Sequence, residues 1–469
     1  MGGFFTSKTL SCFLNEVKGK RIALLGAGKS NRPLVKMFVD AGAAVTVCDK
    51  KDKEQLAALP GIAEYKDRIK FKTGPDYLSD IDADIILRTP GISALSPALV
   101  EYKKRGIAVT SEAELFCMLC PAKIIAVTGS NGKTTTTTLI YKMLREQGHN
   151  AWLGGNIGMP LLPLVGQMSE NDIAVMELSS FQLMNLTPSP DVSVITNIYP
   201  NHLDYHRDME EYVGAKRNIF LHQDSFSRTV LNMDDDVLSG FSGEVIGRCA
   251  LFSAKKRPNF GAYLNDNNQI MFAENEKDIF ICNRNELFLP GKFNLQNFLA
   301  AVTAVWGIAD IGAITEVART FKGVRHRIQY VRTVDGVRYY NDSIATSPSR
   351  VTEGILTLFD ERIIIIAGGY DKNIPFETLG DALAKKTKAV VLMGKTAEKI
   401  KNAITASKYY LPGSPEIFSA KDLEDAAKTA KKIAHVGDIV ALSPGCASFD
   451  MYSDFEERGE HFIKIINSF

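Results

Sequence analysis

Ile124-Ile-Ala-Val-Thr-Gly-Ser-Asn-Gly-Lys-Thr-Thr135 is the stretch that decides the fold of the middle of this chain. An apolar run leads into a glycine-containing turn, and a helical pattern then continues to residue 146. A turn that opens a helix binds phosphate, because its backbone N–H groups and the positive end of the helix dipole attract oxyanions. Lys133 would reach the outer phosphates, and the Thr134 hydroxyl would bind Mg2+. The loop is a shortened Gly-x-x-Gly-Lys-Thr with Val127 at the leading glycine position, and the alternative is a glycine-rich turn before an ordinary helix.

Length and composition indicate a globular protein of several domains. The chain has 469 residues, enough for about three domains, and it is 45% hydrophobic and 23% charged. A formal net charge of +1 gives no reason to expect nucleic acid as a partner. Seven cysteines are scattered, and Cys117-x-x-Cys120 has no second pair at zinc spacing, so we expect reduced thiols in a cytoplasmic protein. Because no apolar run is long enough for a membrane helix and Lys8 and Asn15 break the N-terminal patches, we expect no membrane insertion and no signal peptide.

The first part of the chain has the pattern of a Rossmann-like unit. A strand from residue 20 enters a Gly26-x-Gly28 turn, a helix follows at 32–40, and the next strand ends at Asp49. An acidic residue about twenty positions after the glycines is what such a unit uses for a ribose. Asn31 stands at the third glycine position, which leaves a nucleotide site but a weak candidate for NAD.

A further strand at residues 84–88 is followed by Thr89-Pro-Gly-Ile92. Ligands bind at this carboxyl edge in open parallel sheets, so Thr89 and Gly91 are candidate contacts. The alternative is that the proline and glycine only make a turn.

The central part alternates strands and helices, which predicts a parallel sheet with strands at 124–128, 172–177 and 192–197. Glu177 ends one of these strands and His202 follows another, so both are candidate Mg2+ ligands beside the P-loop. Residues 228–290 contain short β-like runs broken by turn residues, and we predict an antiparallel β excursion there.

After this excursion a helix is predicted at 294–301, where Asn294 and Asn297 share one face. The pair would bind a base edge or cap the helix. The last part is again α/β, with strands at 338–341, 362–367, 389–393 and 438–442. The predicted fold is therefore α/β with three domains: a Rossmann-like domain (1–120), a P-loop ATPase-type parallel sheet with the β excursion (121–324), and a Rossmann-like α/β domain (325–469).

Several motifs in this sequence are similar to those of a known family. The chain resembles the ATP-dependent Mur ligases of bacterial peptidoglycan synthesis, and most of all their D-glutamate-adding branch. The motifs that carry the resemblance are Thr128-Gly-Ser-Asn-Gly-Lys-Thr-Thr135, Gly154-Gly-Asn-Ile-Gly158, His326-Arg327, Met176-Glu-Leu-Ser-Ser-Phe-Gln-Leu183, Leu442-Ser-Pro-Gly-Cys-Ala-Ser-Phe-Asp450 and Phe455-Glu-Glu-Arg-Gly459.

The resemblance implies an acyl-phosphate ligase that joins D-glutamate to UDP-N-acetylmuramoyl-L-alanine at the expense of ATP, with two Mg2+ ions. It also implies small-molecule substrates and a cytoplasmic monomer. Implied catalytic residues are Lys133, Glu177, His202 and Lys216, of which Lys216 would be carbamylated. Implied metal-site residues are Thr134, Glu177, His202 and Lys216.

Each substrate has an implied set of binding residues. The ATP set is Gly129, Ser130, Asn131, Gly132, Lys133, Thr134, Thr135, Asn294, Asn297, Arg327 and Asp342, with the ring of His326 beside them. The UDP-substrate set is Gly28, Ser30, Asp49, Thr89, Gly91, Asn156, Ser179 and Gln182. The D-glutamate set is Thr346, Lys372, Ser448 and Phe455.

Two positions depart from the family pattern: Ile344 stands where lysine is usual, and Lys29-Ser30 replaces more apolar residues. Lys372 or Arg350 would be the residues to compensate for Ile344. The alternatives are a sister ligase of the folylpolyglutamate or muramoyl-tripeptide type, a nucleotide-sensing module without catalysis and, more remotely, an NAD-dependent dehydrogenase.

Overall fold

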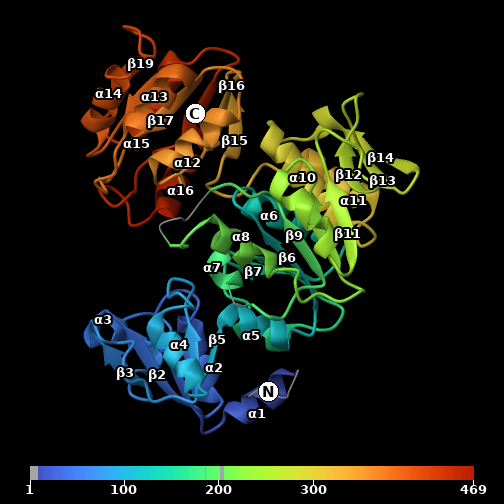
Figure 1. Ribbon diagram of the computed structural model, residues 1–469. Helices are drawn as coiled ribbons and strands as arrows, with labels where there is room; N and C mark the ends of the chain where they lie inside the picture. The colour runs from blue at the N-terminus through green and yellow to red at the C-terminus, as the bar shows by residue number, and fades with distance from the viewer. Residues whose placement is uncertain (1–8, 185, 201–204) are drawn as a thin grey trace. The chain divides into compact units, whose positions relative to one another are not determined.

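The computed structural model describes residues 9–184, 186–200 and 205–469 (Figure 1). The chain divides into two compact units, one formed by residues 1–286 and 296–318 and the other by residues 287–295 and 319–469. Among the described residues, no helix is both long and apolar enough to cross a membrane. The predicted three-domain boundaries at residues 120 and 324 stay predictions.

The first sheet of the first unit is wholly parallel, in the order β3-β2-β1-β4-β5. Its strands are β1 (Arg21–Leu25), β2 (Ala44–Asp49), β3 (Lys70–Thr73), β4 (Ile85–Arg88) and β5 (Ala108–Ser111), and its helices are α1 (Leu10–Val17), α2 (Arg32–Asp40), α3 (Lys53–Ala57), α4 (Pro97–Lys104) and α5 (Glu112–Leu119). The strand order reverses between β1 and β4, and such a switch point opens a crevice at the carboxyl ends of the two strands.

The second sheet of this unit has the order β11-β10-β9-β6-β8-β7 and is also parallel. Its strands are β6 (Lys123–Thr128), β7 (Ala151–Gly155), β8 (Ile173–Glu177), β9 (Val192–Ile195), β10 (Arg228–Asn232) and β11 (Arg248–Phe252). The helices that follow along the chain are α6 (Lys133–Glu146), α7 (Ser180–Leu183), α8 (Met209–Arg217), α9 (Asp236–Ser239), α10 (Lys292–Val305) and α11 (Ile311–Thr320).

The antiparallel excursion is shorter than predicted. Only β12 (Phe260–Leu264), β13 (Gln269–Glu274) and β14 (Lys277–Asn283) pair in antiparallel fashion. The prediction was wrong for residues 229–231, because β10 pairs in parallel with β9 and β11. Thr229, Val230 and Leu231 are fully buried, as in a central parallel strand covered on both faces, and turn residues near them suggested a hairpin instead.

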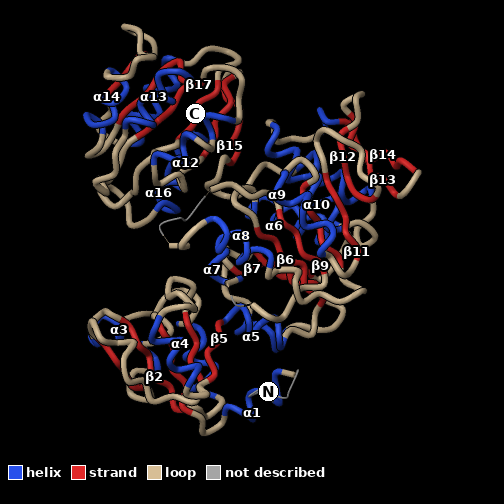
Figure 2. Tube along the Cα trace, viewed as in Figure 1, coloured by secondary structure: helices blue, strands red, loops and turns tan. Residues whose placement is uncertain are grey.

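The second unit is built on one six-stranded sheet in the order β15-β16-β20-β17-β18-β19, in which only β15 and β16 pair in antiparallel fashion. Figure 2 shows the strands of this unit in red among helices in blue. Its strands are β15 (Gln329–Val334), β16 (Val337–Asn341), β17 (Ile363–Ala367), β18 (Thr387–Leu392), β19 (Glu416–Ser419) and β20 (Ile439–Leu442). Its helices are α12 (Pro348–Thr352), α13 (Glu377–Lys386), α14 (Ala397–Thr405), α15 (Leu423–Ile433) and α16 (Phe455–Asn467).

Strand β17, Ile-Ile-Ile-Ile-Ala, shows why this sheet is buried on both faces. Ile363 and Ile365 pack with side chains of α13 and α14, whereas Ile364 and Ile366 pack with those of α15 and α16. A strand with two apolar faces needs helices on both sides. The predicted α/β class with parallel sheets is confirmed, and the carboxyl edges of these sheets position the candidate site.

Candidate functional site

The predicted P-loop forms between β6 and α6. Gly129 and Gly132 have φ of +144° and +81°, values that other residues adopt only with strain. A Cβ at residue 132 would overlap the Asn297 carboxamide oxygen, and one at residue 129 would overlap the Thr196 hydroxyl. The first N–H groups of α6 have no acceptor within the helix, so the loop presents donors of the kind that bind phosphate.

The end of β9 holds this loop in shape. Asn197 Oδ1 accepts from the Asn131 N–H at 2.8 Å, and the Asn197 carbonyl accepts from the Ser130 N–H at 2.9 Å. Thr196 Oγ1 donates to the Asn131 carbonyl at 2.6 Å. Ser130 Oγ lies 2.9 Å from the Tyr212 hydroxyl and is buried. The N–H groups of Ser130 and Asn131 therefore bind protein, and these two residues shape the loop.

Lys133 is anchored on the same turn. Its Nζ donates to the carbonyls of Gly129 and Ser130 at 2.8 and 2.9 Å. Thr134, the next residue, is 7% exposed. The ammonium and the hydroxyl therefore lie at the start of α6, as the sequence predicts.

Glu177 ends β8, the neighbour of β6, and is almost fully buried. Its Oε1 accepts from Asn156 Nδ2 at 2.7 Å, and its carbonyl accepts from the Asn156 N–H. Oε2 is buried and has no hydrogen-bond partner among the residues that the structure describes. A buried carboxylate oxygen without a partner is costly unless a cation satisfies it, so this residue fits the role of a Mg2+ ligand.

Lys216, on α8, is a buried cation near the loop, whereas Lys133 is only half-buried. Its side chain is 1% exposed, and Nζ donates to the Gly129 carbonyl at 2.8 Å and to Thr128 Oγ1 at 3.3 Å. Burial, aided by repulsion from Lys133 and opposed by Glu177, holds the pKa of Lys216 well below its usual value. The amine is therefore more nucleophilic at neutral pH than an exposed lysine.

His202, the fourth predicted catalytic residue, lies outside the described residues. Within the described parts of the chain, no three His, Cys, Asp or Glu side chains gather as a metal site.

In the first sheet, the predicted UDP-binding residues border the switch point between β1 and β4. Asp49 Oδ2 accepts from the Ala27 N–H at 2.7 Å and so fixes the glycine turn. Thr89 begins the loop after β4, and its N–H donates to the Leu25 carbonyl. Gly28 and Gly91 are exposed and Ser30 is half-buried, so the turns around this crevice are accessible.

Asn31, where a third glycine was missing, is buried under this turn. Its Nδ2 donates at 3.0 Å to the carbonyl of Leu25, the last residue of β1, and at 3.3 Å to that of Leu87, the residue before the last of β4. The side chain thus bridges the two strands at which the order reverses. This bridge between β1 and β4 is the structural reason for an asparagine at the position where the pattern has its third glycine.

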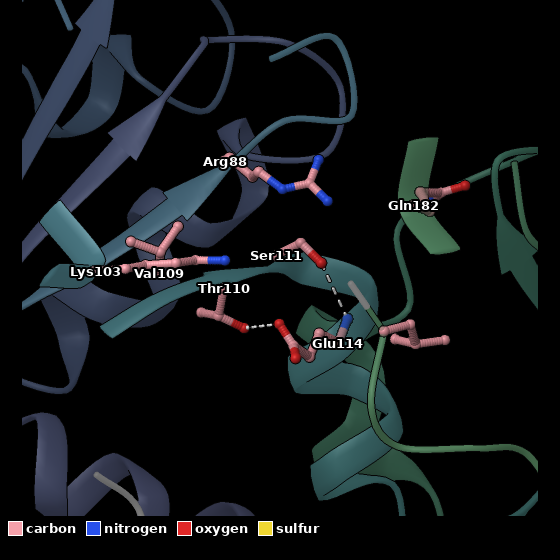
Figure 3. A pocket seen from close by; sticks show the side chains of 8 residues that line it. Arg88, Lys103, Val109, Thr110, Ser111, Glu114 and Gln182 are labelled. Atoms are coloured by element: carbon pink, nitrogen blue, oxygen red, sulfur yellow. Dashed lines mark hydrogen bonds between the residues drawn. The ribbon is translucent and has the colours of Figure 1, made fainter. Parts of the chain in front are cut away.

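Ser179 and Gln182 form a capping box at the start of α7, in which the Gln182 side chain accepts from the Ser179 N–H at 3.0 Å. Gln182 also lines a small cavity with Arg88, Thr110 and Glu114 (Figure 3). Arg88 is buried and donates to the Phe181 carbonyl at 3.1 Å, so it ties the end of β4 to α7. The two predicted substrate contacts are therefore also structural residues.

In the second unit, the predicted D-glutamate residues follow the three adjacent strands β16, β20 and β17, or begin α16. The loops are bonded together: the Gly445 N–H donates to the Ala345 carbonyl at 2.9 Å, and the Tyr370 N–H donates to the Ala447 carbonyl at 2.9 Å. These contacts bring together the loops that contain Thr346, Lys372 and Ser448, and Phe455 packs edge-on near His326.

Asp342 is an acid of this unit whose pKa is strongly shifted. It is buried, accepts from Ser443 Oγ at 2.7 Å and from the Ile328 N–H at 3.2 Å, and burial raises its pKa to about 7. Arg327 lies within electrostatic range, and its Nε is buried without a hydrogen-bond partner among the described residues. His326 is held by Asn341 at 3.0 Å, and burial lowers its pKa. The structure thus places Arg327 near Asp342, and the assignment of these residues to ATP stays a prediction.

The two helix asparagines of α10 differ in their contacts. Asn294 Nδ2 donates to the Pro290 carbonyl at 2.7 Å, so this side chain ties the first turn of α10 to the residues just before it. Asn297 Oδ1 lies 3.4 Å from Thr136 Oγ1, beside the P-loop helix. The hydrogen bond of Asn294 is not an N-cap, because its side chain donates to a carbonyl and accepts from no helix N–H in that contact, whereas Asn297 packs beside the P-loop.

Sequence reasoning missed Arg458, on α16, which is 1% exposed. Its guanidinium donates to Ser343 Oγ and the Ser343 carbonyl at 3.0 and 2.9 Å, and to the carbonyls of Cys446 and Ala447 at 3.1 and 3.2 Å. It therefore clamps two of the loops that carry predicted D-glutamate residues. The Phe455-Glu-Glu-Arg-Gly459 motif contained the signal, but its acceptors are distant in sequence.

Comparisons with known proteins identify the family to which the chain belongs. Residues 127–305 match the Mur ligase middle domain and residues 326–446 match the Mur ligase glutamate ligase domain. The UDP-N-acetylmuramoylalanine–D-glutamate ligase of Acetivibrio thermocellus is 46% identical over 463 residues, which cover 98% of each chain. That of Clostridium botulinum is 45% identical over 459 residues, which cover 98% of this chain and 99% of the relative.

Solved structures share the fold at low identity. The UDP-N-acetylmuramate–alanine ligase MurC of Thermotoga maritima has a TM-score of 0.56 at 18% identity, covering 96% of this chain and 99% of that one. A pseudomurein peptide ligase of Methanothermus fervidus has a TM-score of 0.53, also at 18% identity, with the same coverage. Taken with the two domain matches and the nearly full-length relatives, these findings mean that the chain belongs to the Mur ligase family.

Proposed function

We propose that this chain is an ATP-dependent ligase that adds D-glutamate to UDP-N-acetylmuramoyl-L-alanine in peptidoglycan precursor synthesis. The observation that carries the proposal is the 46% identity, over 98% of both chains, to a relative with that name. The phosphate loop, the buried Glu177 carboxylate and the polar loops of the second unit support it.

The reaction has two steps. A carboxylate oxygen of the muramoyl-alanine substrate attacks the γ-phosphorus of ATP, the bond to the β-phosphate oxygen breaks, and ADP leaves an acyl phosphate. The amine of D-glutamate then attacks the acyl carbon, the bond from carbon to the phosphate-bearing oxygen breaks, and inorganic phosphate leaves as the amine loses a proton. Both steps move negative charge between oxygens, so the principal catalytic demand is electrostatic.

The residues of the P-loop meet this demand. We assign ATP phosphates to the loop residues 129–135, where the N–H groups at the start of α6 and the Lys133 ammonium face negative charge. Mg2+, held by oxygens such as those of Thr134 and Glu177, would supply further neutralisation of the phosphate oxygens. Asn156 keeps the Glu177 carboxylate oriented through its 2.7 Å hydrogen bond.

Lys216 is proposed to be carbamylated. A buried amine with a lowered pKa is uncharged often enough to attack CO2, which forms an N–C bond and releases a proton. The resulting carbamate is an anion close to the loop, where it would, with His202, serve the second metal position. Arg327, Asp342, Asn294 and Asn297 complete the proposed ATP set, whereas the crevice beside Asp49 and Thr89 is assigned to the uridine nucleotide. A cytoplasmic location and a monomeric state are part of the same proposal, and light scattering of the purified protein tests the second.

A substrate panel tests the proposed function. Purified protein with ATP, Mg2+ and UDP-N-acetylmuramoyl-L-alanine should release phosphate only when D-glutamate is also present. L-glutamate, L-alanine and a diamino acid serve as the competing acceptors. Strong turnover with one of these and none with D-glutamate would identify a sister ligase, and no acceptor-dependent turnover would identify a regulatory protein.

A further inference from the structure

The proposed acceptor, D-glutamate, has two carboxylates, and this inference rests on that proposed function. The D-glutamate set contains one cation, Lys372, beside the hydroxyls of Thr346 and Ser448 and the ring of Phe455. A carboxylate bound by an enzyme is best satisfied by a charged donor, above all by a guanidinium. Because the acceptor has two carboxylates and this set has one cation, we expect a second cation in the same loops.

Arg350, on α12, occupies the required place. Its Nη1 donates to the Ile344 carbonyl at 3.0 Å, and the same carbonyl accepts from the Thr346 N–H at 2.8 Å. The guanidinium and Thr346 thus meet at one backbone oxygen. Ala345, between them, accepts from the Gly445 N–H of the loop that contains Ser448.

Arg350 is exposed as a residue, although its guanidinium is partly buried, and most of the guanidinium N–H donors are not used by the protein. A guanidinium has five N–H donors, and the Ile344 carbonyl uses one of them. Among the residues that the structure describes, no carboxylate forms an ion pair or hydrogen bond with Arg350. It therefore has donors left for a ligand.

The surrounding charges favour an anion. Burial lowers the pKa of Arg350, and the like-charged neighbour Arg327 lowers it further. The nearby acid, Asp342, has its pKa raised to about 7 by burial, so at neutral pH it offsets only part of the two positive charges. Two guanidiniums beside one partly protonated carboxyl leave net positive charge, which an incoming carboxylate would neutralise.

We propose that Arg350 binds one carboxylate of the acceptor amino acid, as the second cation of the D-glutamate pocket beside Lys372. Arg350 is then a specificity residue as well as a binding residue, because it favours an acceptor with two carboxylates. Ile344 offers no charge at this place, and α12 supplies the guanidinium instead.

The test compares three variants by steady-state kinetics. Arg350→Gln removes the charge, Arg350→Lys keeps it, and Arg332→Gln is the matched control, because Arg332 is an exposed arginine of the same unit that donates to one carbonyl, that of Asn467. We expect Arg350→Gln to raise the KM for D-glutamate about tenfold, with the KM for UDP-N-acetylmuramoyl-L-alanine within about twofold of the unchanged protein. Arg350→Lys should recover part of the loss.

D-glutamine as an alternative acceptor shows which carboxylate is bound. If Arg350 binds the side-chain carboxylate, Arg350→Gln reduces the preference for D-glutamate over D-glutamine. If it binds the α-carboxylate, both acceptors weaken together; either result supports the site.

The proposal is overturned if Arg350→Gln leaves the KM for D-glutamate unchanged, or if Arg332→Gln raises it as much. Thermal unfolding of each variant controls for loss of the fold, and Arg350→Lys provides the comparison should the glutamine variant unfold. If the unchanged protein does not use D-glutamate, the proposed function fails instead, and that result is separate from the outcome for Arg350.

Discussion

Replacement of Arg458 by methionine tests two effects of this side chain separately: its contribution to the free energy of unfolding, and its effect on the KM for D-glutamate. Methionine keeps an apolar stem of similar length and removes all donors of the guanidinium. Two carbonyls, those of Ser343 and Cys446, then lose the donor described above, whereas the Ala447 carbonyl keeps the N–H of Tyr370. Each buried carbonyl without a donor costs about 1–3 kcal/mol, so the loss is about 2–6 kcal/mol.

The removed charge offsets part of this loss. Burial lowers the pKa of Arg458 to about 10 from an ordinary value of 12.5, which corresponds to a penalty of about 3 kcal/mol for the charged side chain. Leaving the two carbonyls without a donor destabilises the protein, whereas removing the buried charge stabilises it. Arg458→Met should therefore reduce the free energy of unfolding by no more than about 3 kcal/mol. The variant should therefore fold at 25 °C.

Function should suffer more than stability, because the clamp joins the loops of Thr346 and Ser448. We expect the KM for D-glutamate to rise about tenfold and the KM for UDP-N-acetylmuramoyl-L-alanine to stay within about twofold, since its predicted contacts lie in the first unit. Urea unfolding and steady-state kinetics measure the two quantities, and Arg458→Lys, with three donors, should lie between the two proteins. A folded methionine variant with an unchanged KM for D-glutamate would refute the clamp.

Three further substitutions test other parts of the account. Lys133→Ala should abolish ATP-dependent ligation, because it removes the ammonium from the phosphate loop; near-normal phosphate release would contradict that role. Lys216→Ala should be nearly inactive and partly rescued by added short carboxylic acids that replace the carbamate, whereas full activity without rescue would mean that the lysine is dispensable. Burial raises the pKa of Glu112 to about 7 from 4.5, so its contribution to stability is complete below pH 4.5 and is lost as the pH rises to about 7. Glu112→Gln should flatten the decline of the unfolding midpoint between pH 5 and 8, and an unchanged pH profile would count against a buried acid there.

Local patterns in the sequence predict most of the elements and loop ends. The P-loop, the strand ending at Glu177 and the loops after β16 and β20 follow from apolar runs and from the turn residues that end them. These are short-range signals, since a buried strand, a glycine turn and a helix start are adjacent in the chain. Their arrangement at sheet edges follows from parallel pairing.

Long-range partners did not follow from the sequence. The strand β10 is predicted in an antiparallel sheet but lies in a parallel one, because a short buried strand has the same composition in parallel and antiparallel pairing. Asn31 bonds to Leu87 and Arg458 bonds to Ser343, both far away in the chain, and no periodicity reveals such acceptors. The raised pKa of Asp342 likewise depends on burial by several distant segments.

The central claim is that ATP makes the substrate carboxylate reactive, and an isotope experiment tests it most directly. UDP-N-acetylmuramoyl-L-alanine with 18O at both oxygens of its terminal carboxylate would be turned over with ATP, Mg2+ and D-glutamate, and the released phosphate analysed by mass spectrometry. The acyl-phosphate route predicts one 18O atom in each phosphate, because the carbon–oxygen bond breaks when the amine attacks. Ligated product with unlabelled phosphate would contradict the account.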